Sequence, residues 1–176
     1  MQDIDRIRKD NLVLSKSLKD LCVARGLKAA TAESLTGGLI SATMVAVSGA
    51  SEYFDRGFTV YNNTAKHEML GVSEETLARF TEVSGQCVQE MAKGAIERSH
   101  ADLAVAVSGV AGPGPSGGNP AGTVWIGACR RGHPAIARLF HFEGDRDAVR
   151  ESTVHQGLEA LMQCADGADP KGFTRS

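Results

Sequence analysis

Ser34 and the small residues around it, residues 31–38 (TAESLTGG), form the segment best suited to chemistry. A short apolar stretch gives way here to a helical pattern, which predicts a strand-to-helix turn. Ligands of open α/β sheets bind at the carboxyl ends of strands, and N–H groups at a helix start can stabilise an anion. Ser34 is therefore a candidate nucleophile, with the N–H groups of Thr36, Gly37 and Gly38 as oxyanion donors. The alternative is a structural turn in which Ser34 or Thr36 caps the helix.

A serine nucleophile needs a base to accept its proton. None of the five histidines lies in a Gly-rich or small-residue setting, so we expect surface or helix roles for His67, His100, His133, His141 and His155. A lysine can replace histidine if burial lowers its pKa. Lys66 follows a strand pattern that ends at Tyr61 and an Asn-Asn turn. The alternative for Lys66 is a solvated side chain on a surface helix.

Residues 108–122 (SGVAGPGPSGGNPAG) are rich in glycine and proline and follow the most apolar predicted strand. They lack the G-K-[ST] of a Walker loop, and they do not open a helix as a dinucleotide-binding G-x-G-x-x-G does. Backbone N–H groups in such a loop can still approach a phosphate or a ribose closely. A long loop inside a compact domain is more often functional than idle, so we favour ligand binding over a disordered connection.

The composition limits the class of protein. The chain has 176 residues, 19 Lys and Arg against 21 Asp and Glu, and 20 glycines. This charge balance argues against a nucleic-acid or membrane-surface binder. No apolar run approaches the ~18 residues of a membrane span, and the charged N-terminus lacks the pattern of a signal peptide. We expect a cytoplasmic protein with one domain over residues 1–165 and a flexible tail over residues 166–176.

The four cysteines are far apart, with neither a C-x-x-C pair nor zinc-finger spacing to histidine. We expect Cys22, Cys87, Cys129 and Cys164 to be buried, reduced thiols.

Hydrophobic periodicity predicts helices alternating with strands in the order α-β-α-β-α-α-α-β-β-β-α. The expected helices are residues 12–25, 38–47, 64–70, a segment capped by Ser73, 84–99 and 145–162; the expected strands are residues 27–33, 56–61, 101–108, 123–130 and 135–142. The last two strands read as a hairpin. This order predicts an α/β fold in which helices cover both faces of a mixed sheet.

Four motifs, in this order, resemble the CinA C-terminal domain family. They are residues 32–38 (AESLTGG), Gly57 with 60–62 (VYN) and Lys66, residues 108–113 (SGVAGP), and residues 122–127 (GTVWIG). The resemblance runs from about Leu12 to Met162. It implies a three-layer α/β/α sandwich, forming a homodimer or higher homo-oligomer, that needs no metal or cofactor. Stand-alone members are nicotinamide-nucleotide amidohydrolases, which convert nicotinamide mononucleotide into nicotinate mononucleotide and ammonia in pyridine nucleotide recycling.

The resemblance also implies roles for individual residues. Ser34 is the expected nucleophile, Lys66 the general base, and Tyr61 a group that relays or positions protons. The expected substrate-binding residues are Glu33, Thr36, Gly37, Gly38, Asn62, Ser108, Gly109, Ala111, Gly112, Gly114, Arg146 and Arg150.

Arg146 and Arg150 lie one turn apart near the start of the last predicted helix. Their spacing suits a phosphate, to which guanidinium groups bind well. The alternative is a pair of surface charges that contact Asp147 or Glu151 on the same helix.

Two positions depart from the commoner family pattern. Leu35 stands where many members have cysteine, so a thiol has no role there. Residues 112–118 carry an additional proline and serine, which leaves a different amide substrate, or a loss of turnover, as open alternatives. A second hypothesis is a non-catalytic nucleotide-binding or regulatory module. A nucleic-acid-associated protein is a third hypothesis, which the charge balance disfavours.

Overall fold

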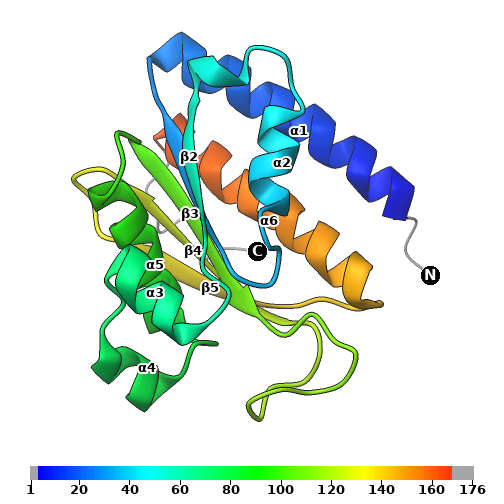
Figure 1. The fold of residues 1–176 in the computed structure, drawn as a ribbon. Coiled ribbons are helices and arrows are strands. Elements are labelled where there is room, and N and C mark those ends of the chain that lie inside the picture. Colours follow the sequence, from blue (N-terminus) through cyan, green and yellow to red (C-terminus); the bar gives the residue numbers. More distant parts are fainter. Residues whose placement is uncertain (1–3, 168–176) are drawn as a thin grey trace.

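A five-stranded sheet crosses the centre of the protein in the computed structural model, which describes residues 4–167 (Figure 1). The strands are β1 (Ala29–Glu33), β2 (Phe54–Thr59), β3 (Leu103–Gly109), β4 (Thr123–Arg130) and β5 (Ile136–His141), in the spatial order β2-β1-β3-β4-β5. Strand β1 is parallel to both β2 and β3, whereas β4 is antiparallel to β3 and β5. The predicted mixed sheet and C-terminal hairpin are confirmed.

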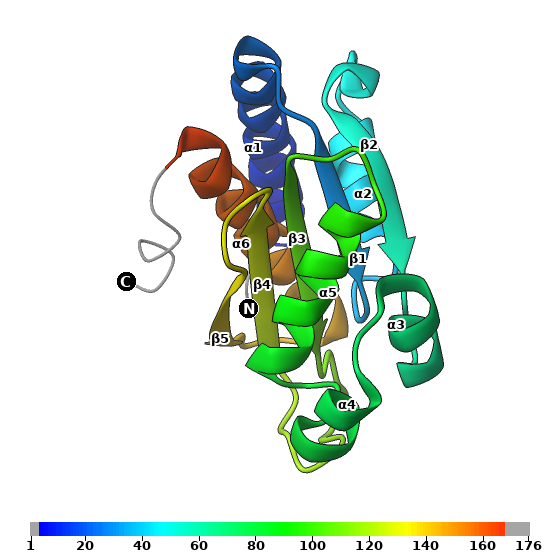
Figure 2. The same ribbon diagram turned by 90° about the vertical axis from the view of Figure 1, so that its left-hand side faces the viewer.

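Helices cover both faces of the sheet (Figure 2). On one face lie α1 (Ile4–Arg25), α2 (Leu39–Val45) and α6 (Arg146–Asp166); on the other lie α3 (Asn63–Leu70), α4 (Glu74–Phe80) and α5 (Gly85–Glu97). A short 3-10 helix, Ala50–Glu52, precedes β2. The arrangement confirms the expected three-layer α/β/α sandwich, and the predicted cap Ser73 accepts a hydrogen bond from Thr76 N.

The ends of several elements differ from the expected ones. Helix α1 begins eight residues before residue 12, because Arg8 and Asn11 contact Glu151 of α6 and so tie its first turns to the fold. Strand β2 ends at Thr59, two residues before the predicted end. Helix α6 extends past residue 162 to Asp166 and is capped by Gly167, so these two residues of the predicted tail belong to the helix and its cap. Residues 168–176 lie outside the described residues.

The two faces of β3 carry side chains of different size. Leu103, Val105 and Val107 pack with α1 and α6, whereas Ala104 and Ala106 face α5. Small side chains let a helix lie closer to a sheet. On this face, a Cβ built on Gly127 of β4 would lie 2.5 Å from Val88 O of α5, so α5 rests on the sheet with almost no space between the backbones.

All four cysteines are buried and free, which confirms the expectation from their spacing. Burial raises the pKa of the Cys22 and Cys164 thiols to about 11 and that of Cys87 to about 12. These thiols are therefore poor nucleophiles at neutral pH.

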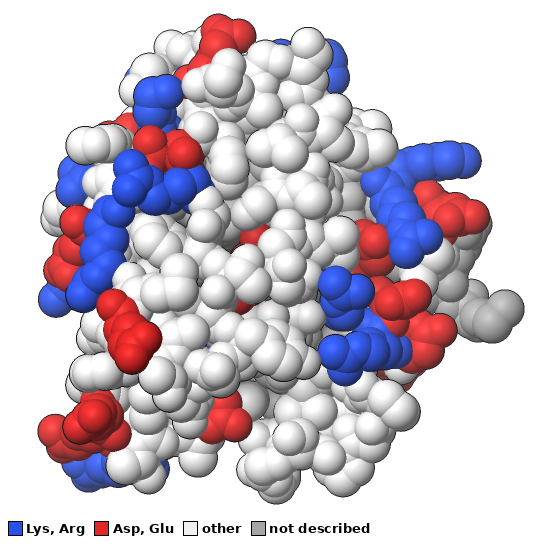
Figure 3. All heavy atoms as spheres, in the orientation of Figure 1, with Lys and Arg blue, Asp and Glu red and all other residues white. Residues whose placement is uncertain are grey.

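The molecular surface in the view of Figure 3 carries Lys and Arg in separate groups, with Asp and Glu beside them. This face has no continuous basic stripe of the kind that follows a nucleic-acid backbone.

Candidate active site

Ser34 lies directly after β1, at the carboxyl end of the parallel strands. Its backbone N–H donates to Val107 O of β3 at 3.1 Å, and its side chain is 7% exposed. The turn that follows is closed by a hydrogen bond from Gly37 N to Ser34 O, and Gly37 and Gly38 have φ values of 60° and 101°. Glycine adopts these angles without steric cost. The sheet thus holds Ser34 by its backbone and leaves its hydroxyl at the sheet edge.

Lys66 lies in the first turns of α3, which Asn62 caps by accepting a hydrogen bond from Ala65 N. Its side chain is 1% exposed, and Nζ donates to Ser34 Oγ at 3.1 Å and to Val60 O at 3.1 Å. The alternative of a solvated surface lysine is therefore wrong. Burial lowers the pKa of Lys66, an effect that Cys87 and Glu82 partly oppose. A lysine of lowered pKa is a stronger candidate for a general base near neutral pH.

Glu33, the last residue of β1, has a structural position beneath the turn. Its buried carboxylate accepts hydrogen bonds from the hydroxyls of Thr31, Thr36 and Ser41 and from the backbone N–H groups of Ile40 and Ser41. These last two N–H groups belong to the first turn of α2, so Glu33 already occupies the anion position at that helix start. Neither Glu33 nor Thr36 is among the residues that line the pocket beside Ser34. Their contact with substrate stays a prediction.

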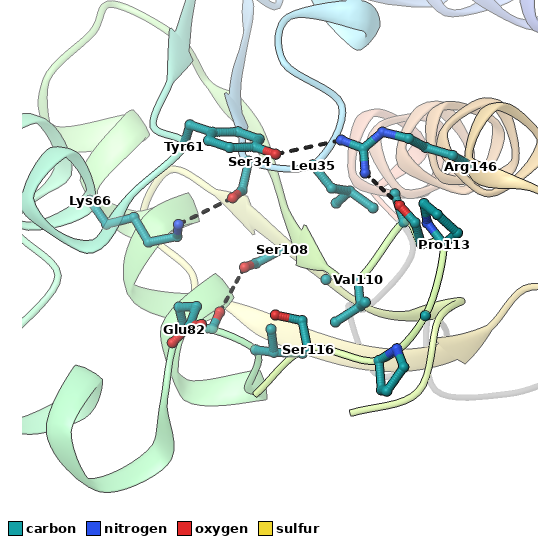
Figure 4. Close-up of a pocket in the computed structure, with 16 residues that line it drawn as sticks. Ser34, Leu35, Tyr61, Lys66, Glu82, Ser108, Val110, Pro113, Ser116 and Arg146 are labelled. Carbon is teal, nitrogen blue, oxygen red and sulfur yellow. Dashed lines mark hydrogen bonds between the residues drawn. The ribbon is translucent and has the colours of Figure 1, made fainter. Parts of the chain in front are cut away.

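A pocket of about 250 Å³ opens beside Ser34 (Figure 4). Its walls combine the end of β1, the start of α3, the segment before α5, the loop after β3 and the first residue of α6. The lining residues are Ser34, Leu35, Tyr61, Lys66, Glu82, Val83, Ser108, Gly109, Val110, Ala111, Gly112, Pro113, Gly114, Pro115, Ser116 and Arg146. The predicted loop residues Ser108, Gly109, Ala111, Gly112 and Gly114 thus share one pocket with the serine and the lysine. Gly37, Gly38, Asn62 and Arg150 lie outside this lining.

The two arginines of α6 have different positions. Arg146 lies at the pocket, where its guanidinium donates to Gly112 O at 2.7 Å and to the Tyr61 hydroxyl at 3.5 Å. Arg150 instead donates to the carbonyl oxygens of Leu35 and Thr36 at 3.2 and 3.0 Å, and its guanidinium lies 3.7 Å from Asp147. Arg150 therefore supports the turn after Ser34, whereas Arg146 lines the pocket while bonded to Gly112 O and the Tyr61 hydroxyl.

Several residues that line the pocket have a backbone N–H group without an acceptor in the described part of the chain. Within residues 4–167, no acceptor is paired with the N–H of Leu35, Ala111, Gly112 or Gly114. The N–H of Gly37, by contrast, is occupied by Ser34 O. The residue directly after a nucleophile commonly supplies one oxyanion donor, so Leu35 N–H is better placed for that role than Gly37 N–H.

Glu82 and Val83 line the pocket and were not expected from the sequence. They follow Thr81, which has φ 66° and ψ 173°. A β-branched residue rarely adopts this conformation, because its Cβ meets the backbone. The sequence has no motif at this point that would predict a pocket residue. The segment is a short polar connection between two predicted helices, and such connections are too common to indicate a site.

Replacing Thr81 with glycine is expected to stabilise the protein. Glycine removes the strain, worth about 1–3 kcal/mol, but costs about 0.5–1 kcal/mol in the entropy of the unfolded chain. We expect the free energy of unfolding in urea to rise by about 1 kcal/mol. Thr81→Ala keeps the Cβ and serves as the control; an equal gain in both variants, or a loss in Thr81→Gly, would contradict the strain.

The comparison with known proteins identifies the family to which this fold and site belong. The model of the CinA C-terminal domain matches residues 11–165. The chain belongs to the CinA C-terminal domain family. It is 49% identical over 141 residues to a nicotinamide-nucleotide amidohydrolase PncC of Enterobacter agglomerans, which covers 80% of this chain and 86% of that protein. The protein of the same name from Escherichia coli K12 is 44% identical over 151 residues, covering 85% and 92%.

Solved structures and longer relatives agree with this membership of the CinA family. A competence/damage inducible protein CihA from Agrobacterium tumefaciens superposes with a TM-score of 0.85 at 39% identity, covering 89% of this chain and 96% of that one. A putative competence-damage inducible protein of Lactiplantibacillus plantarum is 40% identical over 152 residues, which are only 36% of its length. The CinA domain therefore occurs both in chains of this size and within longer proteins.

Two further properties concern the described residues alone. No group of three or more His, Cys, Asp and Glu side chains among residues 4–167 could hold a metal ion. None of the helices in that range has the length and apolar character needed to cross a membrane.

Proposed function

We propose that this CinA-family protein is a nicotinamide-nucleotide amidohydrolase, which hydrolyses the carboxamide of nicotinamide mononucleotide to nicotinate mononucleotide and ammonia. The observation that carries the proposal is the buried hydrogen bond between Lys66 Nζ and Ser34 Oγ, which is 3.1 Å long and lies at a pocket of about 250 Å³. The names of the relatives of 49% and 44% identity support the same substrate.

The acylation step follows from the positions of two side chains. Neutral Lys66 accepts the hydroxyl proton of Ser34 while Ser34 Oγ bonds to the carboxamide carbon. The negative charge moves to the carbonyl oxygen, where the N–H groups of Leu35 and Ala111 stabilise it. The carbon–nitrogen bond then breaks as the nitrogen takes the proton back from Lys66, and ammonia leaves.

Deacylation reverses the roles of the same groups. Water attacks the ester carbon while Lys66 accepts one of its protons. The ester bond breaks, and Ser34 Oγ recovers the proton from Lys66. The acid that forms still carries the second proton of the water; it loses this proton to solvent, and nicotinate mononucleotide leaves as a carboxylate. Tyr61, hydrogen-bonded to Arg146 at the pocket edge, would position the substrate and the leaving nitrogen. No step requires a metal or a cofactor.

The ribose phosphate is assigned to the other side of the pocket. Arg146 supplies a guanidinium, and the N–H groups of Gly112 and Gly114 supply neutral donors, a combination suited to a phosphate. The start of α2 is not available for this purpose because the Glu33 carboxylate occupies it.

The proposed substrate implies a compartment and a metabolic role for the reaction. The reaction would act in the cytoplasm and return nicotinamide mononucleotide to pyridine nucleotide synthesis. A homo-oligomer stays a prediction, as does the assignment of residues 1–165 to one catalytic domain.

Ammonia release from nicotinamide mononucleotide, measured with and without a chelator, tests the proposed activity. We expect metal-independent turnover in the natural protein and a loss of at least about 10³-fold in Ser34→Ala. Ser17→Ala, at an exposed position of α1, is the matched control and keeps full activity. Full activity in Ser34→Ala would refute the mechanism. A rise in melting temperature with nicotinamide mononucleotide but no ammonia would instead identify a non-catalytic binding module.

A further inference from the structure

The charged residues that line the pocket are few, and they have opposite signs. Lys66 and Arg146 are basic, and Glu82 is the acidic member of the lining. Figure 4 shows Glu82 and Arg146 on opposite sides of the pocket, with Ser34 and Lys66 on a third side. The pocket therefore has an acidic residue on one side and a basic residue on the other.

Glu82 is fixed by its backbone, and the negative charge of its carboxylate acts on Lys66, whose pKa it raises. Its carbonyl oxygen accepts a hydrogen bond from Ser108 Oγ at 2.7 Å, which ties the segment to the end of β3. Within residues 4–167 the carboxylate accepts no hydrogen bond and forms no ion pair. A Cβ built on Gly117 would lie 4.0 Å from Glu82 Oε1, so the carboxylate lies beside the glycine-rich loop.

We infer that Glu82 is a specificity-determining residue that favours the cationic ring of the substrate over a neutral ring and over the product, in which a carboxylate offsets the ring charge. The inference rests on the proposed function. In nicotinamide mononucleotide the carboxamide is attached directly to the ring, so the ring must lie close to Ser34 when Oγ reaches the amide carbon. With the phosphate at Arg146, the ring lies on the side of the pocket that carries Glu82.

Glu82 then affects the binding of substrate and of product differently, because the two ligands carry different charges. The pyridinium ring carries a positive charge, which a nearby carboxylate stabilises. Hydrolysis turns the neutral carboxamide into a carboxylate at the same place, and like charges in a partly desolvated pocket repel. Glu82 therefore improves substrate binding and also promotes product release.

Binding measurements on non-hydrolysing protein test this assignment. Ser34→Ala and the double variant Ser34→Ala/Glu82→Gln are titrated calorimetrically with three ligands: nicotinamide mononucleotide, its neutral-ring benzamide analogue, and nicotinate mononucleotide. Gln is nearly isosteric with Glu and disrupts no hydrogen bond of the side chain. Ser34→Ala/Glu68→Gln is the control, since Glu68 is an exposed acid of α3 outside the pocket lining.

We expect Glu82→Gln to weaken nicotinamide mononucleotide about tenfold and to leave the neutral-ring analogue unchanged, because only the cationic ring gains from a close charge pair. The same substitution changes the binding of nicotinate mononucleotide much less, because the positive ring and the carboxylate of that ligand respond to Glu82 in opposite directions. A purely structural role would weaken all three ligands together, and this result, like no change at all, overturns the inference. Ammonia release by the natural protein separates the two proposals. If the natural protein turns over nicotinamide mononucleotide but Glu82→Gln leaves the ligand preference unchanged, the role of Glu82 alone is overturned. If the natural protein neither hydrolyses nor binds nicotinamide mononucleotide, both proposals are overturned.

Discussion

Replacing Lys66 with methionine is expected to abolish ammonia release and, at the same time, to raise the melting temperature. Methionine fills a similar volume but cannot accept the Ser34 proton, so we expect kcat/KM to fall at least about 10³-fold. The stability gain follows because the buried ammonium loses its hydration, the main cause of the lowered pKa of Lys66. Each kcal/mol so relieved raises the melting temperature of a domain of this size by ~2–4 °C.

The pH dependence of this stability gain has a defined sign. Lys66 has a lowered pKa when folded and an ordinary value of 10.5 when unfolded, so between the two the unfolded chain binds more protons. The stability of the natural protein therefore rises with pH across that window, and the advantage of Lys66→Met is largest below it and shrinks toward pH 10.5. The groups that face the ammonium are Ser34 Oγ, Val60 O, Cys87 and Glu82.

Differential scanning calorimetry at several pH values, alongside the ammonia assay, checks both parts. Lys93→Met is the control, because the Lys93 side chain is 69% exposed and lies outside the pocket. Activity within tenfold of the natural protein in Lys66→Met would remove Lys66 as the base. A lower melting temperature than that of the natural protein would show that its two hydrogen bonds outweigh the cost of burial.

Replacing Gly94 with alanine is expected to destabilise the protein and to slow catalysis, although the change adds one methyl group. A Cβ on Gly94 of α5 would overlap Leu70 O and lie 2.8 Å from the Leu70 carbonyl carbon. Both atoms are backbone and cannot rotate away, so helix α3 must move. Overpacking of this kind costs about 3 kcal/mol, or ~6–12 °C in melting temperature.

The catalytic effect of Gly94→Ala follows from the displacement of α3, which also carries Lys66. Leu70 is the last residue of α3, and Lys66 lies one turn before it. Displacing α3 changes the Lys66–Ser34 distance, and a misplacement of 1 Å can cost about 10²-fold in rate. We expect kcat to fall by about that factor.

Gly157→Ala on α6 is the matched control for chemical denaturation and steady-state kinetics. Its Cβ would lie 3.1 Å from Ile40 Cδ1, the movable end of a side chain, and alanine favours a helix by up to about 1 kcal/mol. Gly157→Ala should therefore be close to neutral in both measurements. Equal effects of the two substitutions would contradict the role of the Gly94–Leu70 contact.

The sequence predicted those parts of the site that depend on local pattern. Ser34 was identified from the small-residue turn after an apolar strand, and Lys66 from its place after a strand and a polar turn. Glu82 could not be found this way, because the packing of α5 against β3 and the hydrogen bond from Ser108 Oγ to Glu82 O bring it to the pocket. The bonding of Glu33 and Arg150 was likewise decided by contacts with distant segments, as in the pairing of Arg150 with Leu35 O.

The same reasoning applies to the fold. Hydrophobic periodicity predicted the order of elements and the layers, because helices and strands bury side chains with different spacing. The ends of elements were less well predicted. The residue pattern of 4–11 does not predict the contact with Glu151 that extends α1. Likewise, the pattern near Tyr61 does not predict that Val60 N–H bonds to Glu33 O just beyond the end of β2.

The close contact between α5 and the sheet has a mechanical consequence for the reacting groups. Ser34 is attached to the sheet through Val107 O, whereas Lys66 belongs to a helix that rests on α5. Any sliding of α5 along the sheet would therefore change the distance between Ser34 and Lys66 directly. The backbone of Val88 leaves no room above Gly127 for such sliding. The contact between Gly127 and Val88, which lies outside the pocket, thus helps to keep the distance between Ser34 and Lys66 constant. Loosening this contact would change that distance, and with it the proposed reaction rate, without altering a pocket residue.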